Sequence, residues 1–217
     1  MATAYSPKIV TEDIKLHLDF TSPRCLNNGL TSVKDLVTGD SYAITNTGTD
    51  ISISTTSGGS KSLEWVGSNA AYIDNLDTGT MALFTLEAWV YNVSGGDGRH
   101  SIFRNFWEVV GTSLQFWSYD FDNDYWRATA NNKVPYDKWS HLVTTWDGER
   151  VRHYINGVLE YTQPDISGGT SQTMYHIAGY SGRKFKGKLG GISVYTKTLS
   201  QTEILQNYLA KKDRFEL

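Results

Sequence analysis

Residues 138–161 constrain the fold of this 217-residue chain more than any other segment, and they read KWSHLVTTWDGERVRHYINGVLEY. Lys138–Trp146 and Val151–Ile155 are rich in the β-branched and aromatic residues that favour strands. Asp147-Gly148 lies between them and Asn156-Gly157 follows, and both pairs are preferred at tight turns because they tolerate positive φ angles. The segment therefore predicts a β-hairpin followed by a second turn.

Much of the rest of the chain also reads as strands. Ile14–Phe20 alternates apolar and polar side chains, and Phe84–Tyr91 is predicted to be a central strand. We expect about a dozen short strands, with turn signals roughly every 8–12 residues. Such a pattern is typical of an all-β protein in which two antiparallel sheets form a sandwich. We predict an N-terminal arm over residues 1–13 and a single domain over residues 14–217.

One helix is expected, and it is the last element of the chain. Ser200 is a good N-cap, and Glu203 three residues later completes the sequence pattern of a capping box. Lysines follow in the last turn, where the helix dipole favours positive charge. The predicted apolar stripe of this helix consists of Ile204, Leu205, Tyr208 and Leu209.

Composition and charge narrow the class of protein. Aromatic residues make up 13% of the chain, so we expect a folded core. The net charge of -3 and the scattered positive residues argue against nucleic-acid binding. No apolar stretch has the length of a signal peptide or a membrane span, so no membrane insertion is expected. Cys25 is the only cysteine, and we expect folding in a reducing cytoplasm.

Four segments resemble the laminin-G-like, concanavalin A-like lectin and glucanase domains. They span about residues 61–210 and keep the order of that family: Leu63–Asn69 with Tyr72-Ile73, Phe84–Val90, the hairpin of residues 138–161, and Phe185–Ile204. The resemblance implies a two-sheet jelly-roll sandwich with a short C-terminal helix. It does not imply one function, because this sandwich serves lectins, glycosidases, adhesion modules and virion parts alike.

The N-terminal region has a more particular resemblance. Leu16–Asp19, followed by Val33–Leu36, is similar to the Leu-x-Leu-Asp strand and Asp-Leu turn that often open such domains in virion proteins of tailed phages. The closing strand departs from the family pattern, which commonly has an acidic pair where this chain has Gly190 and Gly191. Glycines supply no carboxylate, so the departure puts an inherited calcium site in doubt.

The carboxylates needed for glycoside hydrolysis are not found in a suitable pattern. That reaction uses two carboxyl groups about 5–5.5 Å apart when configuration is retained, and no Glu-x-Asp-x-Glu run aligns them on one strand face. The nearest run, Asp120, Asp122 and Asp124, lies at a predicted turn. The same three residues are the weak candidates for a Ca²⁺ site, since Ca²⁺ prefers oxygen ligands. We interpret them first as turn residues.

Histidine and cysteine give no catalytic or zinc pattern. His141 and His153 fall in facing strands of the hairpin, but the Trp-x-His motif favours a packing and hydrogen-bonding role for His141. Cys25 is interpreted as a buried apolar thiol. Trp89 and Trp146 are assigned to the core.

Two functional hypotheses remain, with an enzyme third. The first is a non-catalytic virion protein of a tailed phage, a head decoration or other exterior component in many copies, made in the host cytoplasm with other virion proteins as partners. The second is a lectin-like carbohydrate-binding module. Its candidate site is formed by three loops and comprises Asp97, Arg99, Arg104, Asp120, Asp122, Asp124, Trp126, Tyr180 and Arg183. The expected assembly is a homo-oligomer or many copies on a particle.

Overall fold

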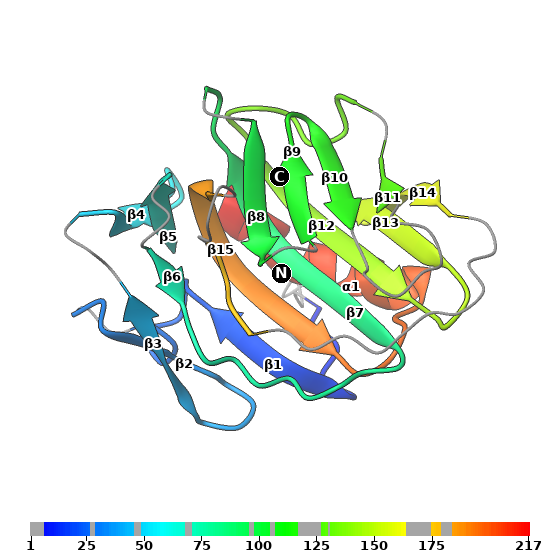
Figure 1. The fold of residues 1–217 in the computed structure, drawn as a ribbon, viewed down its shortest axis with the longest axis horizontal. Helices are drawn as coiled ribbons and strands as arrows, with labels where there is room; N and C mark the ends of the chain where they lie inside the picture. The colour runs from blue at the N-terminus through cyan, green and yellow to red at the C-terminus, as the bar shows by residue number, and fades with distance from the viewer. Residues whose placement is uncertain are drawn as a thin grey trace, which may run out of the picture.

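The computed structural model describes residues 7–26, 29–45, 49–67, 71–95, 98–104, 107–116, 127–129, 131–163, 175–178 and 184–217. A large antiparallel sheet forms the centre of the molecule (Figure 1). Its strands are, in spatial order, β14 (Val158–Thr162), β13 (Val151–Ile155), β12 (Trp139–Trp146), β7 (Phe84–Asn92), β15 (Lys186–Tyr195), β5 (Lys61–Val66) and β4 (Ile51–Thr55). β1 (Ile14–Asp19) joins the second half of β15, on the side where β5 pairs with its first half.

Two smaller sheets face this large sheet. One contains β11 (Arg127–Ala128), β10 (Ser113–Phe116), β9 (Trp107–Val110) and β8 (Arg99–Phe103), and the other contains β2 (Ser32–Lys34), β3 (Ser41–Thr45) and β6 (Tyr72–Ile73). Ile177 bridges them, since it pairs with both Ile73 and Phe103. The three parts therefore form one second layer, and the main hydrophobic core lies between the two layers. The predicted all-β antiparallel sandwich is confirmed.

The predicted hairpin is confirmed as well. β12 pairs with β13 from Leu142↔Ile155 to Trp146↔Val151, and β14 follows the Asn156-Gly157 turn. Asn156 and Gly157 both have positive φ angles, 52° and 79°, as this turn requires. Trp146 belongs to the core between the layers, as predicted from its position in a segment with strong strand propensity.

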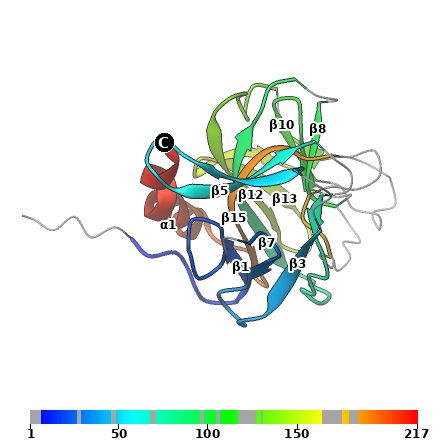
Figure 2. The same ribbon diagram turned by 90° about the vertical axis from the view of Figure 1, so that its left-hand side faces the viewer.

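A helix covers the outer face of the large sheet. α1 (Gln201–Lys211) continues into a short 3₁₀ helix, η1 (Lys212–Phe215). In Figure 2, α1 lies on one side of β12 and β15, and β8 and β3 lie on the other. The predicted capping box is present: the Glu203 amide donates to Ser200 Oγ, and the Glu203 carboxylate accepts from the Ser200 amide at 2.8 Å. The sandwich thus has three layers: helix, large sheet and smaller sheets.

The predicted apolar stripe of the helix is partly wrong. Ile204 is buried, but Leu205 and Leu209 are exposed by 42% and 39%. The buried positions are instead Ile204, Asn207 and Lys211. The reason is that the sheet face below carries polar groups, which select polar partners from the helix.

Those partners form a buried hydrogen-bond network. Asn207 Nδ2 donates to Glu87 Oε2 at 2.7 Å and to the Tyr195 hydroxyl at 2.9 Å, and Asn207 Oδ1 accepts from the Val10 amide at 2.7 Å. His141 Nε2 lies 3.1 Å from Glu87 Oε1, on the opposite side of that carboxylate. The network ties the helix and residues near the N-terminus to the outer face of β7 and β15. The hypothesis that His141 serves packing and hydrogen bonding agrees with this position.

An ion pair connects the end of the helix to β1. Lys211 Nζ lies 3.1 Å from Asp19 Oδ2, and the Arg214 guanidinium lies 3.3 Å from the same oxygen. Burial alone would raise the pKa of Asp19, but the Lys211 charge and the Thr21 hydroxyl together hold it below its ordinary value. Of the polar side chains of β1, His17 and Asp19 are buried while Lys15 is exposed, and Lys211 at the end of the helix supplies a partner for Asp19.

The two glycines of the closing strand have a packing role. A Cβ atom on Gly190 would lie 2.1 Å from Cε1 of Phe215, and one on Gly191 would lie 2.7 Å from the carbonyl oxygen of Leu18. Gly190 makes room for η1 and Gly191 for β1. Any larger residue at these positions, acidic residues included, would displace the element that covers them.

Candidate functional site

The outer face of the second layer carries a group of aromatic and polar side chains that we call the tyrosine–histidine cluster: Tyr72, Asp74, Tyr175 and His176. Ile73 and Ile177 form the backbone beneath it, with hydrogen bonds of 3.0 Å in both directions between their amides and carbonyls. Both isoleucine side chains are fully buried in the core. Because side chains alternate between the two faces of a strand, Tyr72, Asp74 and His176 are directed outward.

The cluster is organised around His176. Its Nδ1 atom lies 2.6 Å from Asp74 Oδ1. The Tyr72 ring meets the imidazole edge to face, with centroids 5.9 Å apart and an interplanar angle of 89°. The Tyr175 ring centroid lies 6.5 Å from the imidazole, and Tyr175 is 58% exposed. The imidazole thus lies next to one carboxylate and two tyrosine rings.

This arrangement combines two kinds of contact within a small area. The tyrosine rings provide apolar faces, while the phenol hydroxyl groups, the imidazole and the carboxylate can form hydrogen bonds. A ligand that itself combines an apolar C–H face with many hydroxyl groups would match both. Among the four residues of the cluster, only Asp74 has a carboxylate.

Sequence reasoning did not identify the cluster. Tyr72 and His176 are about a hundred positions apart, and only the bridge through Ile73 and Ile177 brings them together. The available signal was Tyr72 itself, which belongs to the first family-like segment.

Two of the predicted site residues lie in the described part of the chain. Arg104 is beside the cluster, because its backbone amide donates to the His176 carbonyl at 3.2 Å. Arg99 begins β8, five residues away and thus about 17 Å along the strand. Its guanidinium lies 3.8 Å from the buried Glu108. The structure therefore separates these two arginines.

The other predicted site residues lie outside the described residues: Asp97, Asp120, Asp122, Asp124, Trp126, Tyr180 and Arg183. Asp97 lies between β7 of the large sheet and β8 of the second layer, whereas the described residues next to the other two loops lie at the second layer. Phe116 ends β10 and Arg127 begins β11. On the other side of that sheet, the Ala178 amide donates to Ile102 and the Ser101 amide to Lys184. The loop site stays a prediction.

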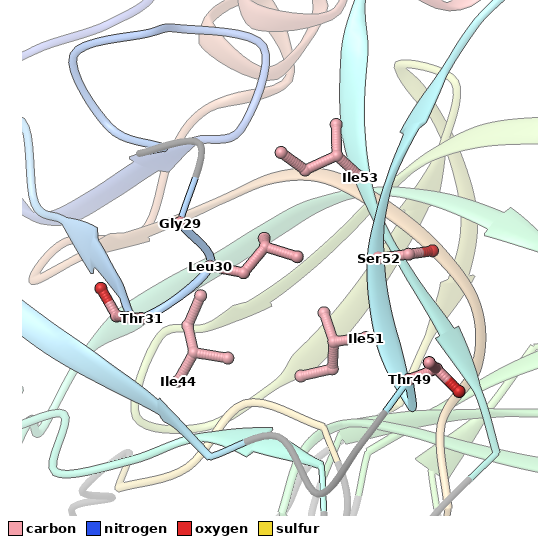
Figure 3. A pocket seen from close by; sticks show the side chains of 8 residues that line it. All are labelled: Gly29, Leu30, Thr31, Ile44, Thr49, Ile51, Ser52 and Ile53. Carbon is pink, nitrogen blue, oxygen red and sulfur yellow. The ribbon is translucent and has the colours of Figure 1, made fainter.

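An apolar cleft lies between β3 and β4 (Figure 3). Its volume is about 600 Å³, and its lining consists of Gly29, Leu30, Thr31, Ile44, Thr49, Ile51, Ser52 and Ile53. Figure 3 shows the leucine and the three isoleucines converging on the hollow, whereas the Thr31 and Ser52 side chains point away. None of the described residues that line the cleft is titratable, so these residues offer no group for acid–base chemistry.

The described residues give little support for a metal-binding site or a reactive thiol. Nowhere among them do three or more His, Cys, Asp or Glu side chains gather closely enough to hold a metal ion. His141 and His153 do not meet: His141 faces Glu87 beneath the helix, whereas His153 Nδ1 lies 2.8 Å from Thr144 Oγ1 on the core side of the sheet. Burial raises the pKa of the Cys25 thiol to about 12, which agrees with the prediction of an unreactive thiol.

The fold and sequence together place the chain in a family. Residues 66–205 match the family model of the concanavalin A-like lectin/glucanases superfamily, which is more than half of the chain. The chain belongs to this superfamily. No curated protein matches the sequence of this concanavalin A-like domain significantly.

Solved structures resemble this concanavalin A-like domain in fold at low sequence identity. Domain 4 of AbnA, an extracellular arabinanase of Geobacillus stearothermophilus, in complex with arabinotriose, is 18% identical with a TM-score of 0.61, over 91% of this chain and 98% of that one. The binding domain of Paraclostridial Mosquitocidal Protein 1 is 14% identical with a TM-score of 0.68, over 91% and 52%.

A third structure is the ligand-binding domain of botulinum neurotoxin serotype D in complex with N-acetylneuraminic acid. It is 15% identical with a TM-score of 0.64, over 90% of this chain and 50% of that one. The concanavalin A-like domain therefore spans about half the length of the two toxin structures. No helix in the described part of the chain is both long and apolar enough to cross a membrane.

Proposed function

We propose that this protein is a non-catalytic carbohydrate-binding module and that the tyrosine–histidine cluster is part of its binding surface. The observation that carries the proposal is the exposed Tyr175 ring beside the His176–Asp74 pair. A sugar ring can place its C–H face on the tyrosine and donate its hydroxyl groups to Asp74 or accept from the imidazole. Two structural relatives were solved with sugars, arabinotriose and N-acetylneuraminic acid, and this supports the ligand class.

The absence of catalysis is part of the proposal. The buried carboxylates Glu87 and Glu108 lie in different sheets, and Glu87 is covered by the helix, away from solvent. The cluster contributes Asp74 alone. A pair of carboxyl groups flanking a glycosidic bond is thus not formed by these residues.

A glycan array tests the proposal directly. The purified protein should bind a defined group of glycans, and binding should fall in the Tyr175→Ala variant but persist in Tyr136→Ala, where a tyrosine of 40% exposure lies elsewhere on the surface. Arms with and without Ca²⁺ test the acidic turn of Asp120, Asp122 and Asp124. A protein that binds no glycan in either arm would contradict the proposal, and release of reducing sugar from a polysaccharide would contradict its non-catalytic part.

A second candidate function is that of an exterior structural protein of a phage particle. The specific observation in its favour is that the two N-terminal segments that resemble phage virion domains form one structural unit. The His17 amide donates to Asp35 Oδ1 at 2.9 Å, and the Leu36 amide donates to the His17 carbonyl at 3.0 Å. Mass spectrometry of purified particles should then find the protein in many copies, and its absence would exclude this role. Carbohydrate binding is compatible with such a position.

A further inference from the structure

A polar pocket lies beside the loop that joins β2 to β3. Its volume is about 440 Å³, and its lining consists of Arg24, from the segment between β1 and β2, and of residues 34–39. None of these residues belongs to the tyrosine–histidine cluster or lines the apolar cleft. A volume of this size falls in the range of about 300–1,000 Å³ that is typical of small-molecule sites. The pocket is therefore a separate place in which a ligand could bind.

The buried carboxylate of Asp35 fixes the shape of this pocket. It accepts hydrogen bonds from the His17 amide at 2.9 Å, the Val37 amide at 3.0 Å and the Thr38 hydroxyl at 3.0 Å. The Gly39 amide donates to the Asp35 carbonyl at 3.0 Å and closes the loop. Several donors satisfy a buried carboxylate, because each of its two oxygens can accept more than one hydrogen bond. The loop and β1 thus supply the partners of Asp35 themselves.

Two positively charged residues, Arg24 and Lys34, line the same pocket. The backbone brings them together, since the Lys34 amide donates at 2.7 Å to the carbonyl of Cys25, the neighbour of Arg24. Both residues are exposed, and in the described part of the chain neither side chain forms an ion pair or a hydrogen bond. Among the described lining residues Asp35 is the only acidic one, and Asp40 follows the loop without lining the pocket. The lining thus carries two positive charges against one negative charge.

The chemistry of these side chains selects an anionic group. A guanidinium presents its N–H donors in a planar fork that fits the oxygens of a carboxylate, sulfate or phosphate group, and an ammonium adds a compact positive charge with three donors. Leu36 and Val37 border the same pocket with apolar surface, and Val37 is 43% exposed. Covering this surface is favourable for the apolar part of a ligand. The lining therefore fits a small molecule that carries an anionic group on an apolar body.

We propose that this pocket is an anion site, in which Arg24 and Lys34 hold the carboxylate, sulfate or phosphate group of a small organic ligand. The body of the ligand lies against Leu36 and Val37. The site differs in its ligand from the proposed carbohydrate surface, because the tyrosine–histidine cluster presents the carboxylate of Asp74, which repels anions. The two surfaces are therefore tested independently of each other.

Titrations with a series of phenyl compounds test the proposal, because the series varies the charged group on one apolar body. Phenyl phosphate, phenyl sulfate and benzoate carry the anionic groups, and phenol is the neutral control. The titrations are followed by two-dimensional ¹⁵N NMR at constant ionic strength, since salt screens exposed charges. At least one of the anions should shift the backbone amide signals of residues 36–39 with saturation, and phenol should not. The anion that binds most tightly identifies the group that the site prefers.

Substitutions establish which side chains hold the anion. Arg24→Gln and Lys34→Gln should each weaken binding by about tenfold, because each removes a positive charge and its hydrogen bonds to the ligand. Lys15→Gln is the matched control, since Lys15 is an exposed lysine of β1 outside the pocket lining, and it should leave the dissociation constant unchanged. Unchanged amide signals elsewhere in the spectrum establish that each variant is folded.

Three results would each overturn the proposal. The first is the absence of saturable shifts with all of the anions, and the second is binding of phenol as tight as that of the anions. The third is an affinity of Arg24→Gln and Lys34→Gln that equals the affinity of the Lys15→Gln control.

Discussion

At the scale of single residues, close contacts explain positions that the sequence pattern left open. The resemblance predicts acidic residues where this chain has Gly190 and Gly191, and from sequence their effect could be stated only as the loss of carboxylates. The structure adds the cause, because Phe215 and the β1 backbone occupy the space of any side chain at these positions. Phe215 is distant in sequence and its approach depends on the turn after α1, so no local pattern could have predicted it.

Gly190→Ala should therefore destabilise the protein by about 1–3 kcal/mol, since the added methyl group has to displace a buried aromatic ring. Urea denaturation monitored by tryptophan fluorescence measures the change. Gly58→Ala is the control, because its added Cβ would meet only Thr56 Oγ1 at 3.8 Å, and it should change stability by less than about 0.5 kcal/mol. Equal stability of Gly190→Ala and the native protein would contradict the assigned role of Phe215.

His17 makes stability depend on pH in a defined direction. Burial, followed by the nearby Lys211 charge, lowers the pKa of His17 from 6.5 to about 4, although Asp19, Glu87 and Asp35 oppose the shift. The unfolded chain then binds a proton at a higher pH than the folded one. His17 should cost stability as pH falls from about 6.5 to about 4, by up to about 1.4 kcal/mol per pH unit, and should have no effect on the pH dependence above that range.

Denaturant midpoints measured at several pH values between 7 and 4 check this expectation. In His17→Gln, which keeps a polar group near Ser193 but does not titrate, the loss of stability over this range should be smaller than in the native protein. Parallel pH profiles for the two proteins would show that His17 is protonated equally well in both states.

At the scale of elements, local sequence signals were sufficient to predict the strands of the hairpin. They were not sufficient to predict which face of the helix packs on the sheet. The hairpin of β12 and β13 and the capping box of α1 follow from turn and cap residues that act within a few positions, and both are confirmed. The face of α1 that meets the sheet could not be predicted in this way. Apolar periodicity favoured Leu205 and Leu209, but the buried Glu87 and Asp19 on distant strands select Asn207 and Lys211.

Asn207→Ala should accordingly be among the most destabilising changes in the helix, by about 2–3 kcal/mol, because it leaves the Glu87 carboxylate and the Val10 amide with fewer partners in a buried place. Leu209→Ala, at an exposed apolar position of the same helix, is the control and should cost less than about 1 kcal/mol. If Leu209→Ala proves the more damaging, the helix docks by its apolar stripe and the polar network is secondary. Thermal unfolding followed by circular dichroism ranks the two variants.

At the scale of the whole molecule, the family fold and the candidate binding surface differ in how far the sequence predicts them. The sandwich could be predicted from strand patterns and from resemblance. The predicted loop site stays a prediction; of its two described residues, Arg104 lies beside the tyrosine–histidine cluster and Arg99 does not. The cluster itself depends on a bridge between strands far apart in sequence, and pairing of that kind is decided by tertiary packing.

The central claim is that this surface binds carbohydrate through the cluster, and isothermal titration calorimetry with the strongest glycan from an array tests it most directly. We predict that Tyr175→Ala weakens binding by about tenfold, equivalent to a loss of about 1.4 kcal/mol, while Tyr136→Ala leaves the dissociation constant unchanged. An unchanged dissociation constant for Tyr175→Ala, in a variant that retains the native stability, would contradict the claim.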